Sequence, residues 1–180
     1  FRDASTGEPI EVTTYNIEIG MYGDDASSND TYYFTDEYGE RQGEVTEVRY
    51  INDVDGGEDT LNFAASNSDV VFSLNQNSNS RFNGAPLEIA DGVVIENIVT
   101  GVGNDRIWGN DEHNTIFTGE GDGRDQVYGF GGSDYIVTGG GDDTISGGAG
   151  CDRLVSGEGN DLIDAGDCDD TVLAGSGDDR

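Results

Sequence analysis

Aspartates that recur every nine residues carry most of the chemistry that this sequence offers. From Thr100 onward the chain divides into nonapeptides, with Asp or Asn at the sixth place and an aliphatic residue at the eighth. The sixth places are Asp105, Asn114, Asp125, Asp134, Asp143, Asp152, Asp161, Asp170 and Asp179. The eighth places are Ile107, Ile116, Val127, Ile136, Ile145, Leu154, Ile163 and Val172. Carboxylates placed with this regularity indicate ligands for a hard cation.

Glycines fill the turn that precedes each of these aspartates. At the fourth place they are Gly103, Gly121, Gly132, Gly141, Gly150 and Gly159. Glycine adopts backbone angles that other residues resist, so it allows carbonyl oxygens to point inward. Calcium accepts roughly six to eight oxygens, backbone carbonyls included. We therefore expect the sixth-place aspartates and the fourth-place glycines to bind calcium together.

The same period predicts the elements that hold these groups. Each nonapeptide supplies a tight turn and a very short strand, whose eighth side chain faces opposite to the seventh and ninth. Two nonapeptides form one coil, and successive coils stack as parallel strands about 4.8 Å apart. Asp143 then lies over Asp125, where two carboxylates repel each other unless a cation lies between them. Counting such pairs predicts roughly six or seven calcium ions.

Two interruptions affect the predicted sites. Asn114 replaces the sixth-place aspartate of the second repeat, and Glu112 replaces its turn glycine, so calcium binding between the second and fourth repeats is less expected. An insertion of two residues, Asp122 and Gly123, widens the third turn and can shift its ligands.

The sequence before residue 100 also predicts β-structure. Short β-type runs at 31–34, 45–51, 61–63, 70–74 and 93–99 alternate with clusters of Gly, Asn, Asp and Ser, and no helical period is present. We expect an all-β chain with three parts: a linker or edge strand at 1–19, a strand-rich flanking region at 20–99, and a parallel β-roll at 100–180.

Charge narrows the choice of partners. The chain has 38 acidic and 8 basic residues, a formal net charge of -30, and no lysine. Nucleic acids and anionic lipids require clustered cationic side chains, so cations are the expected partners. Disorder and adaptation to high salt would each also account for this composition, but the phased aspartates argue against a disordered acidic tail.

No apolar run in the sequence has the length of a membrane span or the pattern of a signal peptide. Since the sequence ends within a repeat, we interpret it as a piece of a longer protein.

The pattern G-G-x-G-x-D-x-U-x resembles the calcium-binding RTX repeat. The segments 55–63 and 90–98, followed by Gly103-Asn104-Asp105, are similar to the C-terminal half of serralysin-type secreted metalloproteases, a resemblance that covers roughly residues 20–180. It implies that Asp59 joins the calcium array at the N-terminal end of the roll. It also implies an extracellular protein that leaves the cell unfolded through a type I exporter and folds when it meets calcium outside.

The two cysteines and the one histidine are not expected to bind calcium. Cys151 and Cys168 belong to stacked repeats, within the Cα separation of about 4.4 to 6.8 Å that a disulfide requires, and the alternative is two inert thiols. His113 is expected to be a turn residue, because a catalytic zinc site needs three protein ligands. No G-x-S-x-G motif is present, so no enzymatic activity is predicted within this segment.

Three functions remain open. The first is a secreted module that binds calcium cooperatively and folds as it does so. The second is the C-terminal module of an RTX metalloprotease or another RTX enzyme, with the catalytic domain outside these residues. The third is a structural or adhesive cell-surface component, which self-assembles or meets a partner through the outward ninth-place residues Phe117, Val137, Val155 and Leu173. Cover by upstream strands or by further sequence would equally account for that apolar face.

Overall fold

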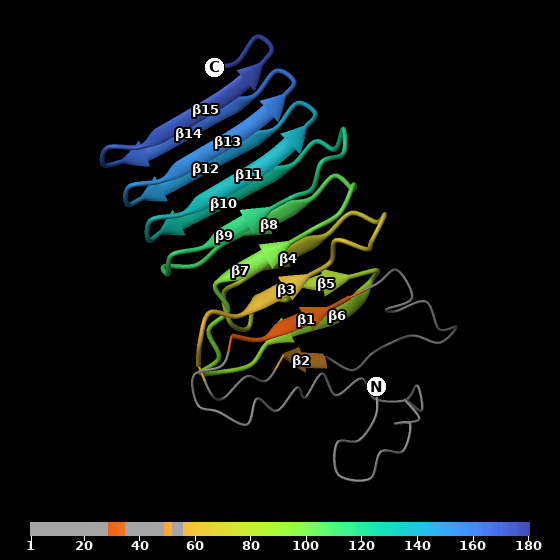
Figure 1. Ribbon diagram of the computed structural model, residues 1–180. Coiled ribbons are helices and arrows are strands. Elements are labelled where there is room, and N and C mark those ends of the chain that lie inside the picture. The colour runs from red at the N-terminus through yellow and green to blue at the C-terminus, as the bar shows by residue number, and fades with distance from the viewer. Residues whose placement is uncertain (1–28, 35–48, 52–55) are drawn as a thin grey trace.

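The computed structural model describes residues 29–34, 49–51 and 56–180, and in these residues the chain forms β-strands and no helix. The strands stack into a two-sheet parallel solenoid that runs from β2 at one end to the C-terminus at the other (Figure 1). The predicted all-β fold with a parallel β-roll is thereby confirmed. The linker or edge strand expected at 1–19 lies outside the described residues. No helix in the described part of the chain has the length and apolar character of a membrane span.

One sheet has seven strands, and every neighbouring pair in it is parallel. Its order is β1 (Thr31–Tyr33), β3 (Thr60–Asn62), β7 (Asn97–Val99), β9 (Thr115–Phe117), β11 (Tyr135–Gly140), β13 (Arg153–Glu158) and β15 (Thr171–Ser176). The three strands that precede residue 100 thus belong to the same sheet as the repeats.

The second sheet has eight strands and contains the only antiparallel pairs found among the described residues. Its order is β14 (Leu162–Asp167), β12 (Thr144–Ala149), β10 (Gln126–Gly131), β8 (Arg106–Trp108), β4 (Val71–Ser73), β5 (Arg81–Phe82), β6 (Ala85–Ile89) and β2 (Arg49–Ile51). β5 pairs antiparallel with both β4 and β6, so a meander replaces the simple coil at this point.

The strand register confirms two nonapeptides per coil. Val127 of β10 pairs with Ile145 of β12, which in turn pairs with Ile163 of β14. The equivalent partner of Val127 in the preceding coil is Ile107 of β8, because the insertion at 122–123 adds two residues to that coil. Eighth-place side chains from both sheets face inward and form the thin core that their spacing predicts.

The core changes along the solenoid. Ile107, Ile116, Val127, Ile136, Ile145 and Leu154 are fully buried. At the N-terminal end an aromatic cluster fills the interior, with Phe63 stacked on Phe34 at 4.4 Å and packed edge-on against Phe82 at 4.9 Å between ring centroids. At the C-terminal end Val172 is 42% exposed. Burial of apolar surface therefore decreases toward the last coil, where other interactions must hold the chain.

Most of the predicted β-type runs before residue 100 are strands, with exceptions. The runs at 31–34, 61–63 and 70–74 correspond to β1, β3 and β4, and the described end of the run at 45–51 is β2. Only the last part of 93–99 is a strand, because β7 begins at Asn97. Strands β5 and β6 have no counterpart in the sequence prediction, since Arg81-Phe82 is too short for a pattern and Pro86 lies within β6.

Candidate metal centre

The first set of sixth-place aspartates lies at the turns that lead into the eight-stranded sheet. Each carboxylate uses its Oδ1 to accept the backbone N–H of the sixth residue in the preceding coil. Asp143 accepts from Asp125 at 2.8 Å, Asp161 from Asp143 at 2.9 Å, and Asp179 from Asp161 at 3.0 Å. We call this set the first acid ladder. Its spacing is the coil spacing, so the aspartates bond the coils to one another.

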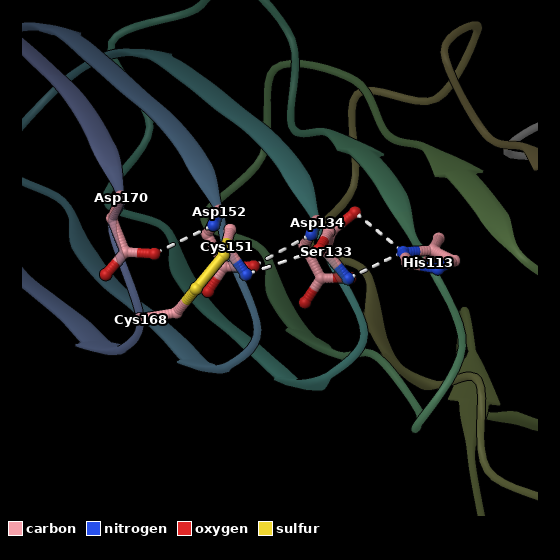
Figure 2. The surroundings of a disulfide bond; sticks show 7 residues. All are labelled: His113, Ser133, Asp134, Cys151, Asp152, Cys168 and Asp170. Carbon is pink, nitrogen blue, oxygen red and sulfur yellow. Dashed lines mark hydrogen bonds between the residues drawn. A yellow bond between two sulfur atoms is a disulfide. The ribbon is translucent and has the colours of Figure 1, made fainter.

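The second acid ladder repeats this arrangement at the turns that lead into the seven-stranded sheet. Asp134 accepts the N–H of Asn114, Asp152 that of Asp134, and Asp170 that of Asp152, each at 2.8 Å. Figure 2 shows Asp134, Asp152 and Asp170 on successive turns, with the carboxylates of Asp152 and Asp170 each bonded to the backbone N–H of the preceding aspartate. The structure therefore brings all nine sixth-place residues into two columns, as the spacing predicts.

Both ladders continue upstream of the repeats. Asp105 accepts the N–H of Val70 at 2.8 Å in the first ladder. In the second ladder Asp59 Oδ1 accepts from Asp30, and Glu96 Oε2 accepts from Asp59, both at 2.8 Å. Glu96 and Asp30 were not predicted. A signal for them exists, because each acid stands directly before a strand, as Asp143 stands before β12.

The second oxygen of these carboxylates tests whether a cation fits at the turns. In the described part of the chain, the Oδ2 atoms of Asp134, Asp143, Asp152 and Asp161 are buried and have no hydrogen-bond partner, and Asp30 Oδ2 is in the same state. A buried polar atom without a partner costs about 1 to 3 kcal/mol, and more if it is charged. In Asp105 and Asp125, by contrast, Oδ2 accepts the hydroxyl of Thr100 and Thr118 respectively.

Backbone carbonyls surround the same turns because the glycines allow coils to approach closely. Gly141 has a φ of 113°, and a Cβ added to it would lie 1.7 Å from the carbonyl oxygen of Gly123. Gly150 stands in the same relation to Gly132 O, also at 1.7 Å. A side chain at these fourth places would displace the next coil. Carbonyl oxygens come close to the carboxylates at the first places, where a Cβ on Gly129 would lie 2.2 Å from Asp134 Oδ2 and 2.5 Å from Gly147 O.

The insertion changes which glycine takes part in this stack. A Cβ on Gly123 would lie 2.1 Å from Gly103 O, so Gly123 occupies the fourth place of the third turn. Gly121, which the sequence assigns there, instead accepts the N–H of Gly140 at 3.2 Å. The two extra residues are accommodated before the aspartate, and the assignment of Gly121 as a fourth-place residue is corrected to Gly123.

Burial raises the pKa values of several carboxyl groups in the acid ladders. Desolvation raises the pKa of Asp125 to about 7 and that of Asp134 to about 6, with the neighbouring carboxylates adding to the effect. The pKa values of Asp105, Asp143 and Asp152 are raised for the same reason. Ionised carboxylates are therefore costly here, and a bound cation would offset that cost.

The donor set fits calcium. Within residues 29–34, 49–51 and 56–180, no group of three or more His, Cys, Asp or Glu side chains could hold a metal ion. A cation at these turns must therefore combine one or two carboxylates with backbone carbonyls, and an all-oxygen set of this kind suits calcium. The unpartnered Oδ2 atoms and the stacked carbonyls supply such a set at the rungs of Asp134, Asp143, Asp152 and Asp161.

Asn114 makes its rung different from all others. Its Nδ2 donates to Glu96 O at 3.0 Å and to Asn110 Oδ1 at 2.9 Å, while its Oδ1 accepts the Asn110 N–H at 2.8 Å. The Asn114 amide thus donates to both neighbouring carbonyl oxygens, and its own oxygen also has a hydrogen-bond partner. This rung is held by hydrogen bonds, in keeping with the expectation that calcium binds less readily here.

Cys151 and Cys168 form a disulfide with a Cα separation of 5.1 Å. It joins the turn of Asp152 to the turn of Asp170 (Figure 2). Cys168 stands at the fourth place of its repeat, where glycine is usual, and its φ is 101°. The cross-link therefore lies at the acid ladder, in the region where the apolar core becomes exposed.

His113 lies at a turn, as its sequence context predicts. Its exposed Nδ1 accepts the N–H of Ser133 at 2.7 Å (Figure 2).

The outward apolar residues also take their predicted positions, because Phe117, Val137, Val155 and Leu173 pair in one column across four strands. We call this column the outer apolar ladder. Leu173 is 48% exposed, and the other three are half-buried.

Comparison with known proteins gives two findings. The family model for the RTX calcium-binding nonapeptide repeat matches four times, at residues 95–124, 121–145, 128–162 and 146–180. The serralysins of Photorhabdus laumondii subsp. laumondii and Photorhabdus luminescens are each 43% identical to this chain over 63 residues, which cover 34% of this chain and 13% of each relative. The stacked acids, the glycine turns and these matches agree, and residues 95–180 are an array of RTX calcium-binding nonapeptide repeats.

Proposed function

We propose that this chain is an extracellular module that binds several calcium ions between its coils and folds as it binds them. The observation that carries the proposal is the set of buried Oδ2 atoms on Asp134, Asp143, Asp152 and Asp161, which have no partner among the described residues. Each belongs to a carboxylate whose Oδ1 is already bonded to the next coil. Calcium supplies the positive charge and the oxygen coordination that these atoms require.

Coupling between binding and folding follows from the balance of forces. The core is only two aliphatic ladders wide, and the formal net charge of -30 opposes compaction. The carbonyl sites exist only when the coils are stacked, so the unfolded chain lacks them. The free energy of calcium binding then contributes directly to the free energy of folding. We retain roughly six or seven ions as the proposed number, counted from the pairs of stacked turns.

The test of the sites is a calcium count on matched variants. Asp143→Asn removes the charge of a buried ladder carboxylate, whereas Asp164→Asn removes the same charge from an exposed position in the adjacent coil. Native mass spectrometry in calcium is expected to show at least one ion fewer for Asp143→Asn and an unchanged number for Asp164→Asn. Equal numbers for both variants and the unaltered chain would contradict calcium binding at this rung.

Secretion is the biological setting that this coupling favours. A chain that stays unfolded at the low calcium of the cytosol suits export through a type I channel, and it would fold outside the cell. Similarity to serralysins supports the proposal that the module is the C-terminal part of a secreted metalloprotease, although the match spans 13% of each relative. An H-E-x-x-H motif upstream in the full gene would support a protease, and a full gene without a catalytic domain would contradict it.

An assembly role is the second candidate, and the outer apolar ladder favours it. Phe117, Val137, Val155 and Leu173 form a continuous apolar column on the outside of the seven-stranded sheet. Sedimentation velocity in calcium is expected to show oligomers that Leu173→Ser disrupts. A monomer at all concentrations would contradict self-assembly through this face.

A further inference from the structure

A hollow lies on the outer face of the eight-stranded sheet, and its lining residue Asp69 borders the first acid ladder near Asp105. It has a volume of ≈ 700 Å³, and its lining comes from β4, the β4–β5 hairpin and outward side chains of β8 and β10. Small-molecule sites typically have volumes of roughly 300 to 1,000 Å³. The proposed binding of calcium between the coils does not use this hollow. We call it the aromatic hollow, after Trp108 and Phe130 in its lining.

Phe130 is the residue that the fold itself does not explain. It stands at the second place of the fourth repeat with a φ of 77°. In six other repeats this place carries a glycine with positive φ, at Gly119, Gly139, Gly148, Gly157, Gly166 and Gly175, whereas Gly101 and Asn110 of the first two repeats do not have a positive φ. A bulky side chain in this conformation costs about 1 to 2 kcal/mol, and glycine avoids the cost. Phe130 is nevertheless 47% exposed, so core packing does not compensate for the strain. Strain kept at an exposed aromatic residue indicates a functional site.

Trp108 supplies a second aromatic surface. It is the only tryptophan in the chain, and it occupies a ninth place whose side chain faces outward. Its ring is stacked on that of Tyr128 in the next coil, with 6.2 Å between ring centroids and an interplanar angle of 10°. Tyr128 thus supports one face of the indole. The hollow therefore has a rigid aromatic residue from β8 and an exposed one from β10.

The β4–β5 hairpin provides the polar side of the hollow. Asn79 has a φ of 55°, and its exposed side chain has no hydrogen-bond partner within the described ranges. Ser78 and Ser80 share a hydroxyl–hydroxyl bond of 2.7 Å. The exposed Arg81 guanidinium donates to Gly84 O at 3.0 Å, and none of the ion pairs in the described region involves it. Amide, hydroxyl and guanidinium groups thus stand next to aromatic rings.

We propose that the aromatic hollow binds a neutral saccharide. The C–H faces of a sugar ring pack on aromatic rings, while its hydroxyls pair with amide and hydroxyl side chains, and the hollow offers both kinds of group. An anionic ligand is disfavoured because the protein carries a formal net charge of -30. A cationic ligand is disfavoured because Asp69, the acidic residue of the lining, already accepts two hydrogen bonds from Asn104, and Arg81 lies in the same lining.

The test uses the full chain saturated with calcium, so that the roll is folded. Cellotetraose, maltotetraose and tetra-N-acetylchitotetraose are the neutral probes, and trigalacturonate is the acidic one. Binding is followed by Trp108 fluorescence and by saturation-transfer difference NMR, which detects the sugar directly. At least one neutral probe is expected to give a saturable response that is stronger than the response to trigalacturonate.

Phe130→Gly makes the test decisive. This variant restores the glycine that the second place usually carries, so it is expected to fold at least as stably as the unaltered chain. Its affinity for the responding sugar is expected to fall about tenfold or more, as loss of a stacked aromatic contact implies. Asn79→Gly keeps the backbone freedom at its positive φ and should also weaken binding. Phe117→Val, on the opposite sheet, is the control and should leave binding unchanged.

Three results would overturn the proposal. The first is the absence of a saturable response to every neutral probe. The second is a response that Phe130→Gly leaves intact while the variant remains folded by circular dichroism. The third is tighter binding of trigalacturonate than of any neutral sugar, which would assign the hollow to an acidic ligand.

Discussion

The carboxylate of Asp161 accepts the backbone N–H of Asp143 at 2.9 Å, one coil away along the solenoid. This bond uses Oδ1 and leaves Oδ2 buried without a partner among the residues that the structure describes. This side chain therefore fixes the spacing of adjacent coils, and under the proposed function its second oxygen would bind a cation. Stacking and metal binding would then be coupled at the level of a single residue.

Protons should compete with calcium at the acid ladders. Burial raises the pKa of Asp125 to about 7 and of Asp134 to about 6, whereas an unfolded aspartate titrates near about 4. Between about pH 4 and pH 7 the folded state thus binds more protons than the unfolded state. The free energy of unfolding of the calcium-free protein must then fall as the pH rises through this window.

Two measurements check this sign. In chelator, β-structure followed by circular dichroism should increase as the pH is lowered from about 7.5 to about 5, within the window set by the raised pKa values. The affinity of the folded protein for calcium should rise with pH over the same range, because calcium must displace protons from the ladder carboxylates. An affinity independent of pH, measured by equilibrium dialysis, would show that these carboxylates do not bind the metal.

Replacing Asn114 with Asp tests the rung that hydrogen bonds hold. Asn114→Asp removes the amide donor to Glu96 O and Asn110 Oδ1 and introduces a buried carboxylate. At limiting calcium the free energy of unfolding should fall by about 1 to 3 kcal/mol. At saturating calcium the number of bound ions should rise by one, as counted by native mass spectrometry. Unchanged stability together with an unchanged count would refute the role given to this amide.

The eighth-place ladder should carry the apolar part of the stability. Leu154 is fully buried, so Leu154→Ala should lower the free energy of unfolding in calcium by about 2 to 5 kcal/mol. Leu173→Ala, at a 48% exposed position in the neighbouring strand, should change it by about 0.5 kcal/mol or less. Urea unfolding with tryptophan fluorescence measures both. Similar effects for the two variants would mean that the aliphatic ladder is not a true core.

The disulfide should stabilise the last coils at some cost in backbone strain. Cys151 and Cys168 are separated by 17 residues, and closing a loop of that size contributes about 3 kcal/mol in the chain-entropy account. Cys151→Ser combined with Cys168→Ser should therefore lower the free energy of unfolding by that order.

Cys168→Gly in place of Cys168→Ser isolates the strain. Because the φ of Cys168 is 101°, the pair Cys151→Ser with Cys168→Gly should be more stable than the double serine variant by about 1 kcal/mol. Equal stabilities by urea unfolding would show that the positive φ at this place carries no cost.

The repeat region could be predicted from the sequence because a single nine-residue period determines its strands, its core positions and its acidic turns. The nine-residue spacing determines the strand, the inward aliphatic and the turn aspartate at once, and the observed pairing of Val127 with Ile145 follows from it. Asp59 lies in the second acid ladder, and its part in the calcium array, which only the resemblance to a family implies, stays a prediction. The position of Gly121 was not, because an insertion of two residues can be absorbed at several points in a turn.

Other features depend on contacts between residues far apart in the sequence. Glu96 stands directly before a strand, but its place in the second acid ladder depends on pairing with Asp59, which is 37 residues away. Strands β5 and β6 form part of a meander in which Phe82 packs against Phe63, 19 residues earlier in the chain. The aromatic hollow requires the hairpin, β8 and β10 to meet, so neither Trp108 nor Phe130 signals it alone.

Coupling of folding to calcium is measured by a calcium titration of metal-stripped protein, followed by far-UV circular dichroism with magnesium as the control. We expect a steep, cooperative gain of β-structure with calcium and none with magnesium, whose preference for rigid octahedral coordination these turns do not meet. Complete β-structure in chelator at neutral pH, unaltered by calcium, would contradict it. The acid ladders would then be a scaffold, and adaptation to high salt would account for the charge.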